Sequence, residues 1–400
     1  MDSAEREGLR PKGNVPNLRF PEFQGEWKEE RLADIADLYK GTGISKDQLS
    51  DDGEPCILYG ELYTKYKSET IREVISKTNI DNTKLVRSKA NDVIIPCSGE
   101  TAEDIAIARC VLNGNILLGG DLNIIRLHGY DGAFMSYQLN GRRKYDIAKV
   151  AQGVSVVHLY GEHLKGVKTI NPCLEEQKKI AGLLALLDER IATQNKIIED
   201  LKKLKSAIIE IEYTPNTKTT SHIGNVIEQI SKRNKNNAIQ NVLSVSNRQG
   251  FIKQSDQFEN RNVASEDTSN YKIVEKNDFA FNPARINVGS IARLTTFEKG
   301  IVSPMYICFR TQENVAPEYI DFFFESKHFY CEIQKRLEGS VRQCLSFEGL
   351  CNIPLSLPSF EMQQLIGKRL FTLGQKIKTE TDLLELLNKQ KQYLLRQMFI

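Results

Sequence analysis

Two short stretches of this sequence carry residue types that could do chemistry. Glu176–Lys178 places a carboxylate close to a lysine, as nuclease sites do. Asn282–Arg285 begins like the Asn-Pro-Pro-aromatic loop of amino-methyltransferases but has no aromatic residue. The first stretch lies on a helix with heptad spacing, and the second lacks the aromatic residue that its motif requires. Neither stretch therefore predicts a catalytic site.

Other catalytic and metal-binding patterns are missing from the sequence. It contains no G-x-x-x-x-G-K-[ST] phosphate loop, no G-x-S-x-G elbow, and no dinucleotide or S-adenosylmethionine glycine fingerprint after a strand. The eight cysteines form no C-x-x-C pair, and the five histidines have no zinc-type spacing. We therefore expect reduced, mostly buried thiols and no bound metal. The sequence argues against an enzyme that acts alone.

Length, composition and charge narrow the class of protein. The chain has 400 residues, too many for one ordinary domain, and its 40% hydrophobic and 26% charged residues are typical of a folded cytosolic protein. No apolar run approaches the roughly 18 residues of a membrane span, and the polar N-terminus does not resemble a secretory signal. We therefore expect a cytoplasmic protein. The net charge of +2 gives no general argument for nucleic-acid binding but is compatible with a local basic groove.

The second half of the chain repeats the first. A shift of 186 residues places Asn91 on Asn277, Gly153 on Gly339 and Pro172 on Pro358, and the register continues through the helices that follow. Residues 27–150 and 217–335 match only in outline. Their short apolar runs predict strands at 93–95, 116–118, 123–125, 291–292 and 306–309, and 134–149 and 317–337 predict helices. The pattern indicates two variable α/β (α+β) segments that alternate with two long helices.

Each long helix has a heptad-like stripe. The first stripe consists of Ile180, Leu184, Leu187, Ile191, Gln194, Ile198 and Leu201, and the second of Ile366, Leu370, Leu373, Ile377, Glu380, Leu384 and Leu387. Each helix of roughly 36 residues would be about 50 Å long. A single stripe favours bundle packing inside one domain, but two matched stripes favour an intramolecular antiparallel coiled coil. In that pair Gln194 and Glu380 would meet near mid-helix and fix the register.

With these features the chain resembles the specificity subunit of a type I restriction-modification system. The segment Pro16–Phe23, followed by Trp27 and Leu32, is similar to the start of that family. The two helix entries are similar as well. Pro172 precedes the pattern Glu-x-Gln-x-x-Ile at 175–180, and Pro358 precedes the same pattern at 361–366. The resemblance covers the chain after residue 15, and the duplication of its short motifs in register is specific.

The resemblance implies a DNA-reading chain with an internal pseudo-two-fold repeat. It divides the sequence into a flexible tail (1–15), target recognition domain 1 (16–171), spacer helix 1 (172–213), a linker (214–220), target recognition domain 2 (221–357) and spacer helix 2 (358–400). In that family each recognition domain reads one half of a split DNA target, and the paired helices set the distance between the halves.

The resemblance also implies partners that do the chemistry. Two methyltransferase subunits bind the specificity subunit and methylate adenine N6, and two motor-nuclease subunits complete the complex and cleave DNA. S-adenosylmethionine, Mg²⁺ and ATP then belong to these partners. We therefore expect this chain to bind no cofactor and to be no enzyme itself.

The residues that contact DNA are expected on polar loops, because base edges are read by Arg, Lys, Asn and Gln, and phosphates are bound by Lys, Arg, Ser and Thr. The candidates in the first domain are Lys40, Thr42, Ser45, Lys46, Tyr63, Lys65, Ser98, Gln152 and Ser155. The candidates in the second are Arg233, Lys235, Asn247, Arg248, Asn282, Arg285, Asn287, Arg342 and Gln343. For each of them an ordinary solvated loop is the alternative.

Two other functions stay open at the level of sequence. The same helices would serve a coiled-coil adaptor whose globular segments bind proteins. An enzyme with an unrecognised site is the third alternative, which the missing motifs disfavour. Salt dependence separates the DNA reader from the adaptor, because phosphate contacts release counterions and make affinity fall steeply with salt.

Overall fold

The computed structural model describes residues 13–81, 84–153, 156–214, 220–247, 249–257, 267–339 and 343–400. The chain divides into two compact units, one formed by Met1–Asn195 with Asp382–Ile400 and the other by Lys196–Thr381. Residues 1–12 of the predicted tail and 215–219 of the predicted linker lie outside the described residues. In the part of the chain that the structure describes, none of the helices combines the length and the apolar composition of a membrane span.

The first unit is built around two small sheets. A five-stranded sheet has the order β2 (Ala36–Lys40), β11 (Leu122–Leu127), β7 (Asp92–Pro96), β9 (Arg109–Val111) and β5 (Thr70–Ile71), and a four-stranded sheet the order β10 (Leu117–Leu118), β4 (Glu54–Ile57), β6 (Ser76–Thr78) and β3 (Leu49–Ser50). Two more pairs are β1 (Lys28–Arg31) with β13 (Lys168–Asn171) and β8 (Ser98–Gly99) with β12 (Val157–His158). The pairings β5 with β9 and β4 with β10 are parallel. Residues 93–95 are fully buried because β7 lies in the middle of its sheet.

Short helices complete the first unit. They are α1 (Leu32–Ile35), η2 (Lys46–Gln48), α2 (Glu61–Thr64), α3 (Ala102–Ile105), α4 (Gly132–Asn140), α5 (Lys144–Val150) and α6 (Gly161–Leu164). The Asp131 carboxylate caps α4 by accepting a hydrogen bond from the amide of Phe134. Gly141 ends this helix, so the predicted helix 134–149 is a pair of helices. Trp27 and Phe134 lie at the centre of the core, with ring centroids 5.8 Å apart.

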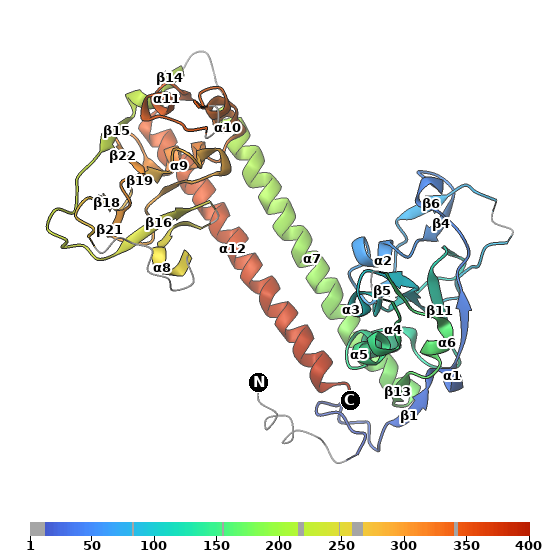
Figure 1. The fold of residues 1–400 in the computed structure, drawn as a ribbon. Helices are drawn as coiled ribbons and strands as arrows, with labels where there is room; N and C mark the ends of the chain where they lie inside the picture. The colour runs from blue at the N-terminus through green and yellow to red at the C-terminus, as the bar shows by residue number, and fades with distance from the viewer. Residues whose placement is uncertain are drawn as a thin grey trace. The chain divides into compact units, whose positions relative to one another are not determined.

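The second unit has a related pair of sheets (Figure 1). One has the order β15 (Ile227–Ile230), β22 (Ile307–Thr311), β19 (Phe279–Phe281) and β20 (Ile291–Arg293), and the other the order β17 (Gly250–Lys253), β16 (Val242–Ser246), β21 (Lys299–Val302) and β18 (Lys272–Glu275). β14 (Thr220–His222) pairs with β23 (Pro354–Ser356). The pairing of β16 with β21 is parallel, as that of β4 with β10 is in the first unit.

Helices and aromatic rings form the core of the second unit. The helices are η3 (Ile223–Asn225), α8 (Gln254–Gln257), η4 (Ile286–Val288), α9 (Pro317–Phe323), α10 (Lys327–Gln334) and α11 (Phe347–Cys351). The Ser326 hydroxyl caps α10 by accepting a hydrogen bond from the amide of Phe329, which splits the predicted helix 317–337 in two. Phe279 and Phe309 stack on neighbouring strands with ring centroids 5.1 Å apart.

The structure repeats as the sequence does. After the same shift, α9, α10 and α11 fall on α4, α5 and α6, and β19, β22 and β23 fall on β7, β11 and β13. Asn91 and Asn277 share a left-handed backbone, with φ of 77° and 70°. The aspartate that follows each of them accepts a hydrogen bond from an arginine of the neighbouring strand, Arg126 or Arg310. These matches confirm the predicted internal repeat.

The two longest helices are α7 (Leu174–Tyr213) and α12 (Phe360–Gln397), as the heptad spacing predicted (Figure 1). All residues of the two predicted stripes are buried or half-buried. Leu186 and Leu386, which lie beside the stripes, are 65% and 61% exposed. Gln194 and Glu380 are both buried, and their mutual contact stays a prediction.

Each unit contains the start of one long helix and the end of the other. In the first unit Leu184, near the start of α7, belongs to the same core as Phe399, just after α12. In the second unit Tyr213, the last residue of α7, belongs to the same core as Leu370 in the first turns of α12. The two helices therefore run antiparallel, as predicted.

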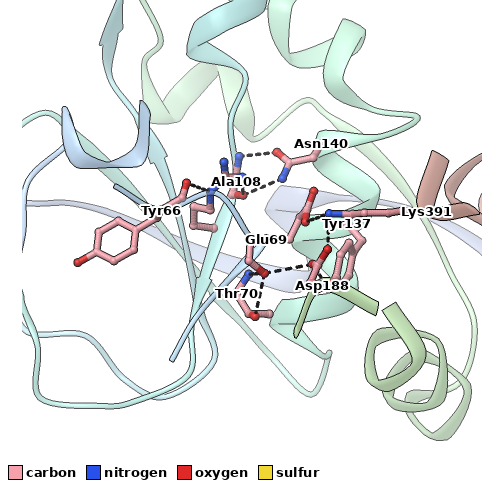
Figure 2. A network of polar contacts seen from close by, with 10 residues as sticks. Tyr66, Glu69, Thr70, Ala108, Tyr137, Asn140, Asp188 and Lys391 are labelled. Carbon is pink, nitrogen blue, oxygen red and sulfur yellow. Dashed lines mark hydrogen bonds and ion pairs between the residues drawn. The ribbon is translucent and has the colours of Figure 1, made fainter. Parts of the chain in front are cut away.

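A buried ionic cluster binds α12 to the rest of the first unit (Figure 2). The Lys391 ammonium lies 2.6 Å from a carboxylate oxygen of Glu69, just before β5, and 2.6 Å from one of Asp188 on α7. Asp188 also accepts a hydrogen bond from the Tyr137 hydroxyl at 2.7 Å, and the ammonium lies 5.7 Å from the centre of the Tyr137 ring. One lysine thus holds two carboxylates from separate elements.

The second unit contains a smaller counterpart of this cluster. The 186-residue shift places Lys205 of α7 on Lys391 of α12. Lys205 pairs with Glu325 at 2.6 Å and lies 5.1 Å from the centre of the Phe322 ring. Each long helix therefore uses the same lysine position, near its C-terminal end, to contact a globular part of its unit.

Candidate nucleic-acid interface

Three of the predicted loops of the first unit meet at the end of β7. The Tyr63 hydroxyl, from the segment after β4, donates a hydrogen bond to the carbonyl oxygen of Ser98 at 2.9 Å. The Ser98 hydroxyl lies 3.3 Å from His158 Nδ1. His158 exchanges two backbone hydrogen bonds with Gln152, at 2.7 and 2.9 Å. Tyr63, Ser98 and Gln152, which are far apart in the sequence, therefore form one polar cluster.

Lys40 brings a fourth loop to the same edge. It ends β2, and its ammonium lies 3.7 Å from the Asp121 carboxylate. The backbone carbonyl of Asp121 accepts a hydrogen bond from the amide of Cys97, beside Ser98. Burial raises the pKa of Tyr63, so its hydroxyl remains a proton donor at neutral pH.

Sequence reasoning missed two side chains of this cluster. His158 and Tyr160 are exposed, and their rings stack with centroids 6.2 Å apart. Tyr160 is 52% exposed. Residues 156–160 alternate between exposed and buried in the structure, but their types do not alternate between polar and apolar, so the sequence carried no clear signal for these two side chains.

The second unit gathers its predicted residues around a tight turn. In residues 282–290, the amide of Asn282 donates to the carbonyl oxygen of Ser290, and the Asn282 side-chain oxygen accepts from the amide of Ala284 at 3.1 Å. The Ser290 hydroxyl donates to the carbonyl oxygen of Val245, which binds the turn to the end of β16. Asn282 is buried and shapes the turn, whereas Arg285 is exposed on it.

A further loop reaches this turn from the other side. The amide of Leu345 donates to the carbonyl oxygen of Pro283 at 3.1 Å. This contact brings the exposed Gln343 close to the turn, and Asn247 is exposed just after β16. Asn287 is half-buried in the turn itself. The candidates Ser155, Arg248 and Arg342 lie outside the described residues.

The predicted loops occupy equivalent places in the two units. They follow β2 and β15, β4 and β16, β7 and β19, and α5 and α10. The strands of each pair have the same partners, since β2 pairs with β11 as β15 pairs with β22, and β7 pairs with β11 as β19 pairs with β22. The DNA-contacting loops predicted in the first half of the sequence are therefore structurally equivalent to those predicted in the second half.

Arg233 and Lys235 lie elsewhere in the second unit. Together with Lys232 and Lys299 they line an open groove of about 840 Å³. The groove lies at the start of β16, since the Asn241 side chain, just before this strand, donates to the carbonyl oxygen of Lys299. The turn near Asn247 lies at the other end of β16.

The other predicted residues divide into exposed and internally bonded side chains. Lys46 and Ser45 are exposed, and the Ser45 amide donates to the Gln48 side chain at 2.9 Å. The Thr42 hydroxyl accepts from the amide of Val86 at 3.0 Å. Lys65 lies 2.7 Å from a carboxylate oxygen of Glu61 and also bonds Ser76, so it stabilises α2 and its neighbours.

The carboxylate-lysine stretch at the start of α7 is structural. Glu176 is 1% exposed and forms an ion pair with Arg19 at 2.8 Å. Gln177 accepts a hydrogen bond from the amide of Asp131 and donates one to the carbonyl oxygen of Pro172. Gln363 repeats this arrangement in the second unit. Within the described ranges no group of three His, Cys, Asp or Glu side chains is placed to hold a metal ion.

Comparison with known proteins assigns this framework to a family. A family model described as the type I restriction modification DNA specificity domain matches residues 24–203 and again 209–389. The chain belongs to this family. The two matches coincide with the two halves of the internal repeat. The chain therefore recognises the DNA target in a type I restriction-modification system, which is the role of the family.

Relatives of this specificity family match the chain over nearly its whole length. A type I restriction enzyme MjaVIII specificity subunit from Methanocaldococcus jannaschii is 24% identical, and the match covers 94% of this chain and 90% of the relative. A crystal structure of a type I restriction-modification S subunit from M. genitalium is 17% identical, with a TM-score of 0.63 and coverage of 96% of this chain and 99% of that one. At this identity the likeness confirms the fold, two globular domains with two long helices.

Proposed function

We propose that the two loop clusters read the two halves of a split DNA target, one cluster in each domain. The observation that carries this proposal is the repetition of the loops on equivalent strands, with different side chains in the two domains. A shared framework places polar side chains in the same way twice, while the different side chains select different bases. DNA reading therefore depends on loops, and the strands fix their positions.

We propose further that catalysis belongs to partner subunits. Two methyltransferase subunits with S-adenosylmethionine would methylate adenine N6 in the recognised target, and two motor-nuclease subunits with Mg²⁺ and ATP would cleave DNA. The chain itself then acts as a non-enzymatic subunit in the cytoplasm. The absence of metal-ligand groups among the described residues is compatible with this division but also fits many binding proteins.

Sequencing of DNA methylation tests the reading role. The chain is expressed with its methyltransferase partner, and separately without it, in a host that lacks other adenine methylation. We expect a split methylated motif only when both proteins are present. Replacement of residues 221–357 by the corresponding segment of a relative should change one half of the motif. A complex that forms but methylates no motif, or a replacement that alters both halves, would contradict the proposal.

Arg285 provides a sharper test within one domain. Its side chain is exposed on a turn that four hydrogen bonds or more hold in place, so it can reach a base edge without distorting the fold. Arg285→Ala should relax one position in one half of the motif, with a loss of about 1–3 kcal/mol of discrimination if the contact is bidentate. Lys335→Ala removes an exposed cation just after α10 of the same unit, where it pairs with Glu332, and should leave the motif unchanged.

A further inference from the structure

The groove at the start of β16 differs from the loop clusters in its chemistry. Four cationic residues line it, Lys232, Arg233, Lys235 and Lys299, and the described residues of its lining include no carboxylate and no aromatic ring. One carboxylate pairs with a groove residue, since Glu275 lies 2.9 Å from the Lys299 ammonium. Arg233 donates to the side-chain oxygen of Asn270, an uncharged group. The groove therefore carries an excess of positive charge.

The loop that carries three of these cations has a fixed shape. Asn234 is 3% exposed, and its side chain accepts from the amide of Ile239 at 3.1 Å and donates to the carbonyl oxygen of the same residue at 3.0 Å. The Thr268 hydroxyl donates to the Asn237 side chain, and the amide of Ile273 donates to the carbonyl oxygen of Lys232. The buried side chain of Asn234 thus holds the backbone while its neighbours point their charges outward.

We propose that this groove binds the sugar-phosphate backbone of duplex DNA, independently of base sequence. This inference rests on the proposed reading function and separates its phosphate contacts from its base contacts. An open groove with several cations fits a continuous polyanion, and its described lining offers no aromatic platform for unpaired bases. Lysine ammoniums are point charges that bind phosphate without selecting a base.

The position of the groove suits this role. It lies at the start of β16, and the turn with Asn247 and Arg285 lies at the other end of this five-residue strand. At about 3.4 Å per residue the two sites are about 14 Å apart. The major groove of B-DNA is about 12 Å wide. A duplex whose base edges face the turn can therefore place a phosphate strand in the basic groove.

The corresponding loop of the first unit has a different charge. It follows β2 and carries Lys46 next to Asp47, whereas the loop after β15 carries Lys232, Arg233 and Lys235. The second domain should therefore contribute more of the salt-dependent binding than the first.

Salt-dependent DNA binding by the complex of this chain with its methyltransferase partner tests the proposal. The variant is Lys232→Gln/Arg233→Gln/Lys235→Gln. The control is Lys253→Gln/Lys327→Gln/Lys335→Gln, which removes equal charge from exposed positions of the same unit. Both are compared with the natural chain on a duplex that carries the methylated motif and on a duplex of shuffled sequence.

We expect the groove variant to bind both duplexes more weakly by the same factor, about 10²-fold near 0.1 M salt. Its slope of log affinity against log salt should decrease by up to about 2.7, at ~0.9 for each lost phosphate contact. The methylated motif and the discrimination between the duplexes should stay unchanged. The control should keep the natural slope.

Other outcomes overturn the proposal in distinguishable ways. If the groove variant has the same slope of log affinity against log salt as the natural chain, the groove does not bind DNA. A loss confined to the motif duplex, or a changed motif, means that these residues read bases. Weakened binding of the methyltransferase subunit with normal DNA binding assigns the groove to a protein partner. If the natural chain binds both duplexes equally well, the reading function fails, and the change in slope still decides the role of the groove.

Discussion

Lys391→Met should strongly destabilise the first unit. Lys391 lies 2.6 Å from carboxylate oxygens of both Glu69 and Asp188, and all three side chains are at most 13% exposed. At an effective dielectric constant of about 20, each contact supplies about 6 kcal/mol of attraction, which desolvation largely offsets. Removal of this lysine leaves two carboxylates buried together, with the buried Arg109 as a remaining cation nearby. We therefore expect a loss of about 3–5 kcal/mol in the free energy of unfolding.

Tryptophan fluorescence during urea unfolding measures this loss. Trp27 is the only tryptophan and lies in the core of the first unit against Phe399, so its emission reports this unit. With a urea slope near 3 kcal/mol per molar, the midpoint should fall by about 1–2 M. Lys389→Met, two residues away with a 67% exposed side chain, should shift the midpoint by less than about 0.2 M.

A variant that neutralises Lys391, Glu69 and Asp188 together distinguishes the effect of buried charge from the effect of lost packing. Lys391→Met combined with Glu69→Gln and Asp188→Asn should recover part of the loss, because it removes both buried carboxylates but leaves Arg109 buried without their attraction. Equal midpoints for Lys391→Met and Lys389→Met would refute the reasoning. A large loss that the combined variant does not recover at all would assign the effect to packing or to the buried Arg109 instead of the two carboxylates.

The pH dependence of the same variant has a defined sign. Burial lowers the pKa of Lys391, but Glu69 and Asp188 raise it by more, and the result lies above the ordinary 10.5. A lysine whose pKa is higher in the folded chain than in the unfolded chain stabilises the fold fully at pH values below the unfolded-state pKa. This stabilisation is lost as the pH rises through the folded-state pKa. The difference in midpoint between the natural chain and Lys391→Met should therefore stay constant from neutral pH to about 10 and shrink above 10.5.

Two further predictions concern glycines and thiols. A Cβ atom at Gly132 would clash with the backbone oxygen of Asn91 and lie 2.9 Å from the Cys110 sulfur, so Gly132→Ala should cost about 1–3 kcal/mol in the same fluorescence assay. Gly182 on α7 faces open space, so Gly182→Ala should stabilise by about 0.5–1 kcal/mol in that assay. A thiol reagent at neutral pH should modify the exposed Cys173 and Cys331 first, as mass spectrometry of the labelled chain would show, and faster labelling of the buried cysteines would contradict the described fold.

The elements with strong local signals were predictable from the sequence. The 3-4 spacing of apolar residues located both long helices and the side they bury, because a helix repeats its faces every 3.6 residues. Pro172 and Pro358 marked their beginnings within two residues. The apolar run at 93–95 predicted a strand, and it is β7, where all three residues are buried.

The grouping of the candidate residues was not predictable. Tyr63 and Ser98 meet through one hydrogen bond between distant segments, and no local pattern encodes that contact. Arg233 and Arg285 look alike as loop arginines, but they lie at opposite ends of β16 because each follows a different strand. The charge of Lys65 predicts a DNA contact, but Glu61 four residues earlier predicts an ion pair on one helix, and the ion pair is what the structure has.

The contact between Trp27 and Phe399 has a consequence for biosynthesis. The two residues are separated by about 370 positions, which a ribosome needs about 20–75 s to translate. Until Phe399 is synthesised, the core around Trp27 and Phe134 lacks the aromatic ring that completes it. The core of the second unit needs only residues between Ile209 and Leu370, so it can close earlier. The domain that leaves the ribosome first is therefore completed last, and its unfinished core stays exposed longest.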